Sequence, residues 1–114
     1  MVGHQVMLQF TLHYILMPIL ILNIVVFVHE LGHLLIARYF KMRTPVFSVG
    51  FGREIIGFTD KFNTRWKLSV LPLGGYVSVD TLDKQPLYQR TLVAFGGPLA
   101  NMILAILLMT IVGL

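Results

Sequence analysis

The sequence of 114 residues contains no cysteine. Disulfide bonds and metal sites with thiolate ligands are therefore excluded. The absence of cysteine gives little information about the cellular compartment. Internal repeats and low-complexity segments are also absent, so the sequence does not indicate a repeat architecture.

Charged residues are scarce as well. They make up 12% of the chain, about half of the ~25% that is usual in globular domains. Hydrophobic residues reach 56%, above the roughly 45–50% typical of such domains. Both deviations come from two apolar runs without Lys, Arg, Asp or Glu, Phe10 to Val28 and Thr91 to Leu114. The composition therefore argues against a soluble globular domain.

Each apolar run is long enough for a transmembrane helix, since about 20 residues cross the ~30 Å hydrocarbon layer. A cleaved signal peptide explains the first run poorly, because no Lys or Arg precedes it and no small-x-small cleavage site follows it. The sequence predicts a mainly α-helical membrane protein, with two transmembrane helices flanking a small membrane-associated β-sheet. We expect one module over residues 1–114, with a helix at about 8–40, a β-rich segment at about 44–79, a linker at about 80–90 and a helix at about 91–114.

The basic residues indicate the orientation of the chain. All nine Lys and Arg residues lie between Arg38 and Arg90, within or beside the connection between the two runs. Cytoplasmic loops of membrane proteins collect Lys and Arg. We therefore expect residues 41–90 at the cytoplasmic face and both chain ends outside. Topology is a sufficient reason for this basic cluster, so the expected partner is the lipid bilayer and not a nucleic acid.

The middle of the chain favours β-structure. The stretches Val46–Thr59 and Arg65–Val79 are rich in β-branched and aromatic residues, with Gly and Pro between them. Polar and apolar residues alternate after Thr64, which is the period of a half-buried strand. Asp60–Asn63 is a plausible turn between the two stretches. We expect a small antiparallel sheet at the membrane face.

His29 and His33 lie where the first apolar run continues toward Phe40. Their four-residue spacing separates them by about 6 Å along a helix and places both on one side, so their imidazoles can converge on one ion. Glu30 lies about 60° from His33 in projection and could reach a water molecule at the metal. This is the H-E-x-x-H pattern of two zinc ligands and a general base. Ionisable groups in a membrane are costly, and a bound cation would offset that cost.

The third ligand of the predicted zinc site is missing from this pattern, because a catalytic zinc normally has three protein ligands. His4 lies in the N-terminal tail and His13 lies on the opposite face of the helix, so neither can complete the site from this helix. Asp60, Asp80 and Asp83 are available, but their spacing favours none of them.

Three residues within the apolar helices predict local features. Gly32 leaves room for another backbone to approach the helix. Pro98 follows two glycines and should lie in the first turn of a helix or at a break. Asn101 would be a buried polar group that needs a partner.

Four stretches together resemble a known family. They are "HELGH" at His29 to His33, "FSVGFG" at Phe47 to Gly52, "LPLGGYV" at Leu71 to Val77 and "GGPLAN" at Gly96 to Asn101. Their order and spacing resemble those of the site-2 proteases, the intramembrane zinc metalloproteases. Within that family, the chain is most similar to the N-terminal part of the bacterial regulator of sigma-E protease.

This resemblance implies that His29 and His33 bind Zn²⁺ and that Glu30 is catalytic. It implies cleavage of transmembrane protein substrates in the bacterial inner membrane, as in regulated proteolysis of anti-sigma factors or of signal-peptide remnants. It also implies that the β-segment holds substrate in extended form. The candidate substrate-binding residues are Gly50, Gly52, Gly74, Gly75 and Asn101.

The sequence departs from the family pattern after the second apolar run. The family's third ligand is an Asp in an L-D-G motif on a later span, and this branch also carries PDZ domains; neither occurs here. The remaining part of the same protein is therefore an expected partner, and we expect little or no proteolysis from the 114 residues alone.

Two other interpretations are compatible with the sequence. The chain could be a catalytically inactive membrane subunit that holds a metal or packs against a partner, in which case Asn101 serves helix–helix packing. It could also be part of a transporter with a proton-relaying His/Glu cluster, although the H-E-x-x-H spacing gives that interpretation no special support.

Overall fold

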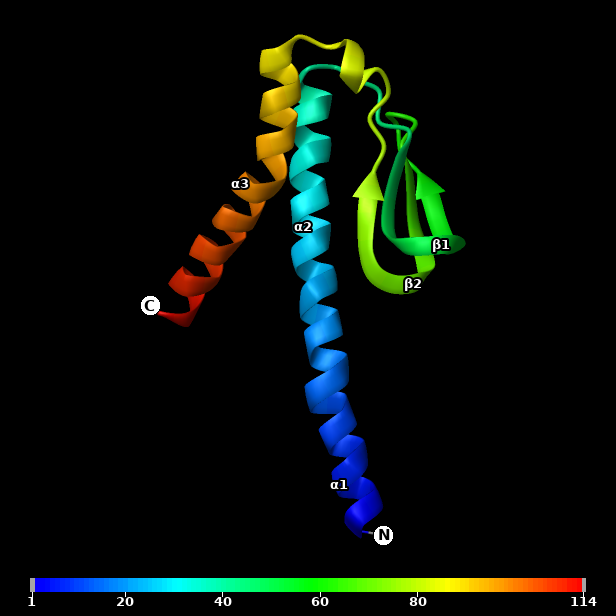
Figure 1. Cartoon of the computed structure of the whole chain (residues 1–114), viewed down its shortest axis with the longest axis vertical. Helices are drawn as coiled ribbons and strands as arrows, with labels where there is room; N and C mark the ends of the chain where they lie inside the picture. Colours follow the sequence, from blue (N-terminus) through cyan, green and yellow to red (C-terminus); the bar gives the residue numbers. More distant parts are fainter. Residues whose placement is uncertain (1, 114) are drawn as a thin grey trace.

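In the computed structural model, which describes residues 2–113, two helical rods and a curved sheet lie side by side (Figure 1). The elements follow in the order α1 (Val2–Thr11), the π-helical turn η1 (Leu12–Leu16), α2 (Met17–Tyr39), β1 (Val46–Thr59), β2 (Arg65–Val77), the 3₁₀ turn η2 (Leu82–Lys84) and α3 (Leu87–Val112). The rod α1–η1–α2 is central, with α3 on one side and the sheet on the other. Both rods are long and apolar enough to cross a membrane.

The first rod begins at Val2 and not near residue 8. The prediction followed the charge-free apolar run, but the more polar residues before Phe10 include no proline that would stop a helix. Pro18 lies at the start of α2, directly after the π-helical turn. Proline lacks an N–H group and its ring displaces the carbonyl four residues earlier. A wider π turn at that place lets the helix continue.

The second rod, α3, begins at Leu87 and contains Pro98 in its interior, not in its first turn. Figure 1 shows that α3 bends there, so its second half leaves α2. The helix ends at Val112, and Gly113 follows with a φ of 88°. This left-handed conformation is the usual glycine cap of a helix C-terminus. The predicted helix end at residue 114 lies outside the described residues.

The two strands pair with each other in both parallel and antiparallel orientation, at different places. Glu54–Thr59 of β1 runs antiparallel to Arg65–Ser69 of β2, around the turn at Asp60–Asn63, so the predicted hairpin is confirmed. The beginning of β1, Val46–Val49, lies on the other side of the same β2 residues and runs parallel to them. It also pairs antiparallel with Gly75–Val77 at the end of β2.

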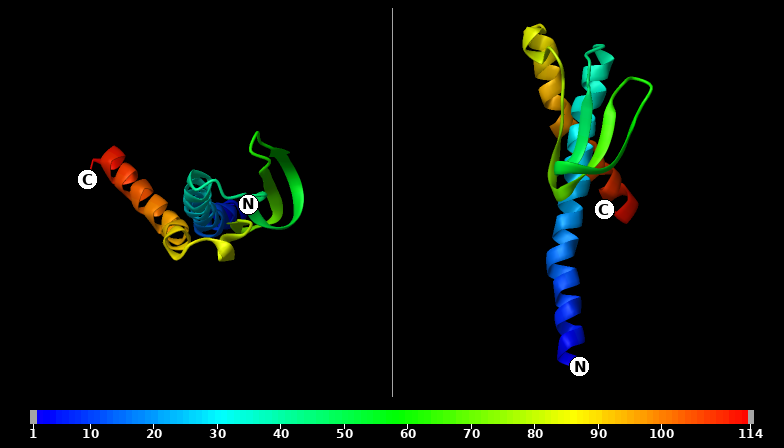
Figure 2. Two further views of the ribbon diagram at one scale, coloured as in Figure 1. Left: turned by 90° about the horizontal axis from the view of Figure 1, so that it is seen from above. Right: turned by 90° about the vertical axis from the view of Figure 1, so that its right-hand side faces the viewer.

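Each strand therefore folds back, so that its two ends pair with the same segment of the other strand. The sequence pattern did not predict this fold-back. The bends contain Gly50, Gly52 and Gly74, whose φ angles are 87°, 90° and 99°. Side chains other than glycine rarely adopt such angles. Figure 2 shows the resulting curvature of the sheet from two further directions.

The sheet lies along α2 and not beyond its end (Figure 1). Phe27 of α2 packs edge-to-face on Phe47 of β1, with 5.5 Å between ring centroids. Farther toward the N-terminus of α2, the Asn23 side chain donates a 2.7 Å hydrogen bond to the carbonyl oxygen of Pro72. Asn23 precedes Tyr39 by about 24 Å of helix. The bend of β2 thus lies beside the middle of the first rod.

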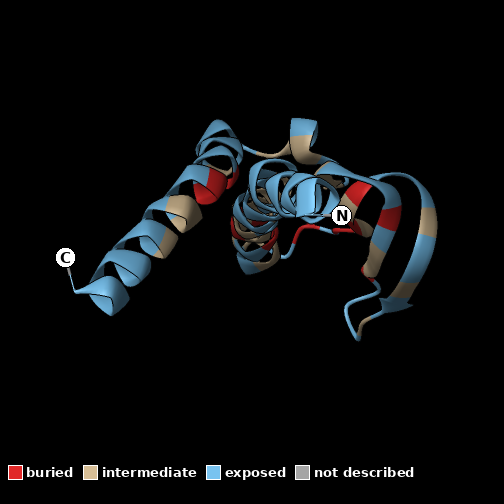
Figure 3. Cartoon of the chain, turned by 90° about the horizontal axis from the view of Figure 1, so that it is seen from below, coloured by how far each residue is buried: buried red, intermediate tan, exposed pale blue. Residues whose placement is uncertain are grey.

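The buried core is small. The buried hydrophobic side chains are Leu34, Ala37, Met42, Phe47 and Val93, and α1 and η1 contain no buried residue. Figure 3 shows that most of the helical surface is exposed. Apolar surfaces of this extent are typical of contact with lipid or with further protein.

Candidate metal centre and active site

The metal centre is built where α2 and α3 cross. The two helices touch through glycine: a Cβ atom on Gly32 would overlap the carbonyl oxygen of Gly96, and one on Gly96 would lie 2.6 Å from the carbonyl oxygen of Gly32. Only glycine allows backbones to approach so closely. The room predicted at Gly32 is therefore confirmed, and the Gly96 backbone fills it.

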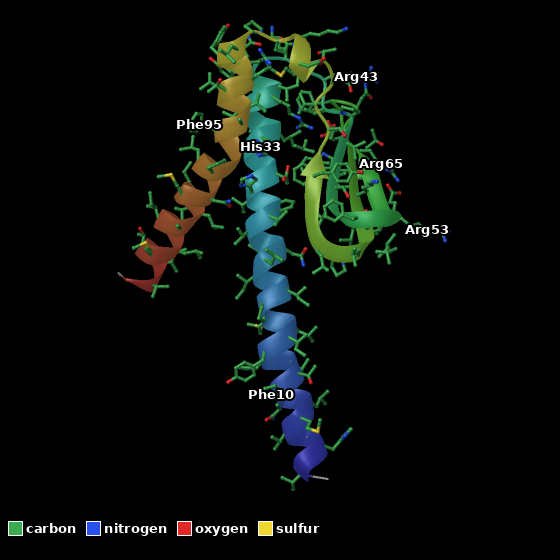
Figure 4. The ribbon with its side chains drawn as sticks, in the orientation of Figure 1. Phe10, His33, Arg43, Arg53, Arg65 and Phe95 are labelled. Carbon is green, nitrogen blue, oxygen red and sulfur yellow. The ribbon has the colours of Figure 1, made fainter. Side chains whose placement is uncertain are left out.

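His29, Glu30 and His33 form one cluster on α2. The two imidazole rings have centroids 4.8 Å apart and planes at 80°. One ligand atom from each of the three residues lies within 4.8 Å of the other two. All three residues are partly buried. Figure 4 labels His33 on α2 at the level where α3 passes. The predicted H-E-x-x-H residues are thus brought together, as the helical spacing requires.

The outer ring nitrogens of both histidines contact α3. Nδ1 of His33 lies 2.6 Å from the carbonyl oxygen of Val93, and Nδ1 of His29 lies 3.0 Å from Nδ2 of Asn101. The partner that Asn101 was predicted to need is therefore His29. Metal-binding imidazoles commonly use their second nitrogen for such a hydrogen bond, which orients the ring.

The inner ring nitrogens converge in front of Gly97. A Cβ atom at this position would lie 2.6 Å from Nε2 of His29 and 2.6 Å from Nε2 of His33. Glycine at this position therefore lets the α3 backbone approach both imidazoles closely. Zinc binds imidazole nitrogen at about 2.0–2.1 Å and accepts two histidines with a carboxylate or water. The two imidazoles and the carboxylate of Glu30 are a donor set that fits a zinc ion.

Glu30 faces the gap between the histidines and the sheet. In projection down α2 it lies about 60° from His33 on one side and about 20° from Asn23 on the other. Asn23 contacts the bend of β2 through Pro72. The carboxylate is therefore directed toward the side on which the sheet lies.

No aspartate joins the cluster within the part of the chain that the structure describes. Asp60 forms an ion pair with Arg38 at 2.5 Å, and Asp80 lies 3.8 Å from Arg43. Asp83 is exposed on η2. The third ligand that a catalytic zinc normally has is not among these three candidates.

Arg38 fixes the hairpin turn to the end of α2. Its guanidinium contacts Asp60 and lies over the Phe62 ring, 4.6 Å from the ring centroid. Burial alone would raise the pKa of Asp60. Hydrogen bonds from the Trp66 indole and from Arg38, together with the backbone N–H groups of Thr64 and Phe62, outweigh it and hold that pKa below its usual range.

The four glycines proposed to contact substrate lie in the sheet and not beside the histidines. Gly50, Gly52 and Gly74 form the strand bends. Gly75 pairs with Val49, and a Cβ atom there would overlap the carbonyl oxygen of Ser48. Their visible role is to let the strands fold back, while Asn101 lies at the metal centre.

Sequence analysis missed several residues that build the site, namely Asn23, Val93 and Gly97. A usable signal was present for two of them, because Val93, Gly97 and Asn101 recur every four residues. Four-residue spacing places side chains on one helix face. The contact of Asn23 with Pro72 had no such signal, since it depends on how the sheet packs.

Comparisons with known proteins agree with this geometry. The sequence model that describes peptidase family M50 matches residues 17–114 of this chain. A protein of Agrobacterium fabrum is 43% identical over 86% of this chain and 32% of its own length. Proteins of Brucella suis and Rickettsia conorii are each 39% identical, over 80% and 79% of this chain and 30% of their own lengths. All three are named "putative zinc metalloprotease".

The chain thus spans about a third of the length of these relatives. The family match covers most of the chain, including α2, the sheet and α3, and the identities exceed what chance gives over such lengths. The H-E-x-x-H cluster fits the zinc dependence of this family. The chain belongs to peptidase family M50, the site-2 protease family of zinc metalloproteases.

Proposed function

We propose that this chain carries the zinc-binding part of an intramembrane protease that cleaves transmembrane protein substrates. The observation that carries the proposal is the convergence of two imidazole Nε2 atoms in front of Gly97, with the carboxylate of Glu30 beside them. Both helices around this cluster are apolar enough to cross a membrane. Ionisable residues at such a depth are typically functional.

In this proposal His29 and His33 hold the zinc ion and Glu30 moves protons. Bound zinc makes water more acidic and polarises the carbonyl of a peptide bond. Glu30 accepts a proton from the attacking water on its carboxylate, and the water oxygen forms the new bond to the carbonyl carbon. Glu30 then donates that proton to the amide nitrogen as the C–N bond breaks. A cleaved peptide and an intact Glu30 result.

The substrate is held in extended form beside β2. A helix hides its peptide bonds, so a transmembrane substrate must unwind before it is cut, and a strand edge can bind the unwound segment. The end of β2, Gly75–Val77, pairs with β1 on one side and lies next to α2 on the other (Figure 1).

Asn23 and Pro72 are in contact, and after its bend at Gly74 the end of β2 runs beside α2 in the same direction (Figure 1). We infer that the β2 edge lies near the turn of α2 that carries Glu30. A substrate strand paired with Gly75–Val77 would then lie between the sheet and the carboxylate. Gly50, Gly52, Gly74 and Gly75 serve this arrangement by shaping the bends, and Asn101 serves it at the metal.

The remaining parts of the proposal concern the surroundings of the site. The chain lies in the bacterial inner membrane, with the N-terminus outside and the Lys- and Arg-rich connection entering from the cytoplasmic side. A further segment of the same protein supplies the third zinc ligand, as a carboxylate or a histidine. The substrate is a membrane-spanning protein, such as an anti-sigma factor or a signal-peptide remnant.

The test uses the longest polypeptide that the gene encodes, reconstituted in liposomes with a single-span substrate. Glu30→Gln should keep its zinc and lose at least a hundredfold of the cleavage rate, because only the proton acceptor changes. His29→Ala should lose both zinc and cleavage. Zinc is measured by elemental analysis and cleavage by the size of the products.

A Glu30→Gln variant that cleaves normally would contradict the proposal, as would an active protein without zinc. If the unsubstituted protein cleaves nothing and His29→Ala leaves its partner binding unchanged, the chain is instead a membrane subunit that packs with a partner.

A further inference from the structure

One face of α3 contacts both imidazoles of the metal centre. Val93, Gly97 and Asn101 follow each other at intervals of four residues, so they lie on one face of the helix. Val93 and Asn101 contact the Nδ1 atoms of His33 and His29, at 2.6 Å and 3.0 Å. Gly97 lies between them, opposite both Nε2 atoms. The contacts of α3 can therefore decide which nitrogen of each ring carries the hydrogen.

For His33, the carbonyl group of Val93 determines which ring nitrogen carries the hydrogen. A backbone carbonyl oxygen can only accept a hydrogen bond. At 2.6 Å, Nδ1 of His33 must be the donor, so a neutral ring carries its hydrogen on Nδ1. Its Nε2 then has a free lone pair directed toward the space in front of Gly97.

For His29 the partner is an amide, which can donate or accept. With Nδ2 of Asn101 facing the ring, the amide donates to Nδ1, and the hydrogen of a neutral His29 must sit on Nε2. That hydrogen would occupy the nitrogen that faces Gly97. In the same orientation the Oδ1 atom of Asn101 is buried without a hydrogen-bond partner. A half-turn of the amide exchanges the two atoms with little change in shape.

We propose that Asn101 is a positioning residue that accepts a hydrogen bond from Nδ1–H of His29 through its Oδ1 atom, and so holds His29 in the form whose Nε2 is free to bind zinc. The buried oxygen then bonds to the ring, the amide NH2 takes the place that the oxygen leaves, and His29 becomes equivalent to His33. A free imidazole favours the other form, with its hydrogen on Nε2, so the amide must select against that preference. The inference rests on the proposed role of His29 and His33 as zinc ligands. It concerns which ring nitrogen carries the hydrogen before zinc binds.

The test reads the position of the hydrogen directly, in the full chain without metal. Long-range ¹H–¹⁵N correlation spectra distinguish Nδ1–H from Nε2–H rings when the imidazoles are neutral. In a His4→Gln, His13→Gln background only the two rings of the metal centre remain. Both rings should carry their hydrogen on Nδ1. A ring with its hydrogen on Nε2 in this background overturns the inference.

Substitutions at Asn101 provide the second arm. Asn101→Leu removes the acceptor, so one ring should change to the Nε2–H form while the other, held by Val93, keeps its Nδ1–H. Asn101→Asp supplies a carboxylate acceptor and should restore the Nδ1–H form. Met102→Leu, on the adjacent exposed position, is the matched control and should change neither ring. An unchanged spectrum for Asn101→Leu overturns the inference.

Zinc affinity, measured in the same samples by competition with a chromophoric chelator, separates this inference from the proposed function. Loss of the hydrogen bond to the outer nitrogen of a metal-binding imidazole typically weakens metal binding by about 10–100-fold, and we expect that loss for Asn101→Leu. If both rings carry their hydrogen on Nδ1 but the chain binds no zinc, the proposed zinc site is contradicted and the role of Asn101 is not. If the chain binds zinc tightly but one ring carries its hydrogen on Nε2, the role of Asn101 is contradicted and the zinc site is not.

Discussion

Gly97 is a residue whose missing side chain lets α3 pack against the candidate metal centre. Val93 and Asn101 contact the outer nitrogens of the two histidines, and Gly97 lies close to the inner ones. A glycine inside a helix costs about 1 kcal/mol relative to alanine. That cost has a reason here, because the Cβ of any larger residue would overlap both imidazoles.

Gly97→Ala should therefore separate zinc binding from folding. The new Cβ would lie 2.6 Å from both Nε2 atoms, so we expect zinc affinity to fall at least a hundredfold. The helical content should be retained, since alanine favours helix, while the two imidazole rings move to accommodate the Cβ. Zinc content and the far-ultraviolet circular dichroism spectrum give the two readouts.

Gly3→Ala is the matched control for this change, because no atom lies within 4 Å of a Cβ at that position. It should leave zinc content unchanged. Normal zinc binding by Gly97→Ala would mean that the ion lies elsewhere.

Sequence reasoning at the residue scale succeeded where one helix carries all the information. His29, Glu30 and His33 lie within two turns of α2, so their spacing alone brings them together. Val93 and Gly97 could not be assigned in that way. Their contact with the histidines depends on the level at which α3 crosses α2, and that level is set by the meeting of two backbones.

At the scale of elements, the hairpin turn is tied to α2 by charge. Asp60 accepts hydrogen bonds from Arg38, from the Trp66 indole and from backbone N–H groups of Thr64 and Phe62. The pKa of Asp60 is lowered as a result. A carboxyl whose pKa is lowered on folding stabilises the fold fully above its unfolded pKa of about 3.9. The stabilisation is lost as the pH falls through the lower folded value.

Asp60→Asn should remove this stabilisation at neutral pH. Hydrogen bonds to charged groups contribute about 1.5–3 kcal/mol, so we expect a loss of that order for the docked hairpin. Trp66 is the only tryptophan of the chain and reports the change through its fluorescence. In the unsubstituted chain, its emission should stay constant from neutral pH to about pH 4 and change only in stronger acid.

Asp83→Asn serves as the control, since Asp83 is exposed on η2, and should leave the emission unchanged. A transition of the unsubstituted chain centred near pH 4 to 5, where ordinary carboxyl groups titrate, would contradict the lowered pKa of Asp60.

The strands illustrate a limit of sequence reasoning at the same scale. Alternation and turn residues correctly predicted two strands and the turn at Asp60–Asn63. They did not predict the parallel pairing of Val46–Val49 with Arg65–Leu68. Periodicity records which side chains face in or out, but not where a strand folds back. That fold-back occurs at glycines with positive φ, which read equally well as loop residues.

At the scale of the whole molecule, the two rods form a hairpin whose connection leaves from one end. Tyr39 and Leu87 lie at that end, and the described ends of the chain lie away from it (Figure 1). The sheet then returns along α2, with exposed apolar residues at its bends, including Phe51, Leu71 and Leu73. The sequence pattern did not predict this return, which depends on packing between the sheet and α2.

The absence of cysteine makes the proposed orientation directly testable. A single introduced cysteine is a unique site for a membrane-impermeant maleimide. His4→Cys should be labelled in intact cells stripped of the outer membrane, and Lys61→Cys should be labelled only in inverted vesicles. Both positions are exposed in the structure.

Leu71→Cys completes this series, since the return of the sheet along α2 would keep it from the reagent on either side of the membrane. The reverse labelling pattern for His4→Cys and Lys61→Cys would invert the proposed topology. Efficient labelling of Leu71→Cys in one preparation would show that the bend of β2 reaches water.

The bend at Pro98 divides α3 into two parts of unequal freedom. The part that includes Val93 and Gly96 is packed on α2, and Asn101 just beyond the bend still contacts His29. Val112 lies about 24 Å along α3 from Gly96, so a rocking of about 5° would shift it by about 2 Å, whereas Gly97, about 1.5 Å away along the axis, would hardly move. We therefore expect any motion of α3 to displace its C-terminal end far more than the residues that contact the imidazoles.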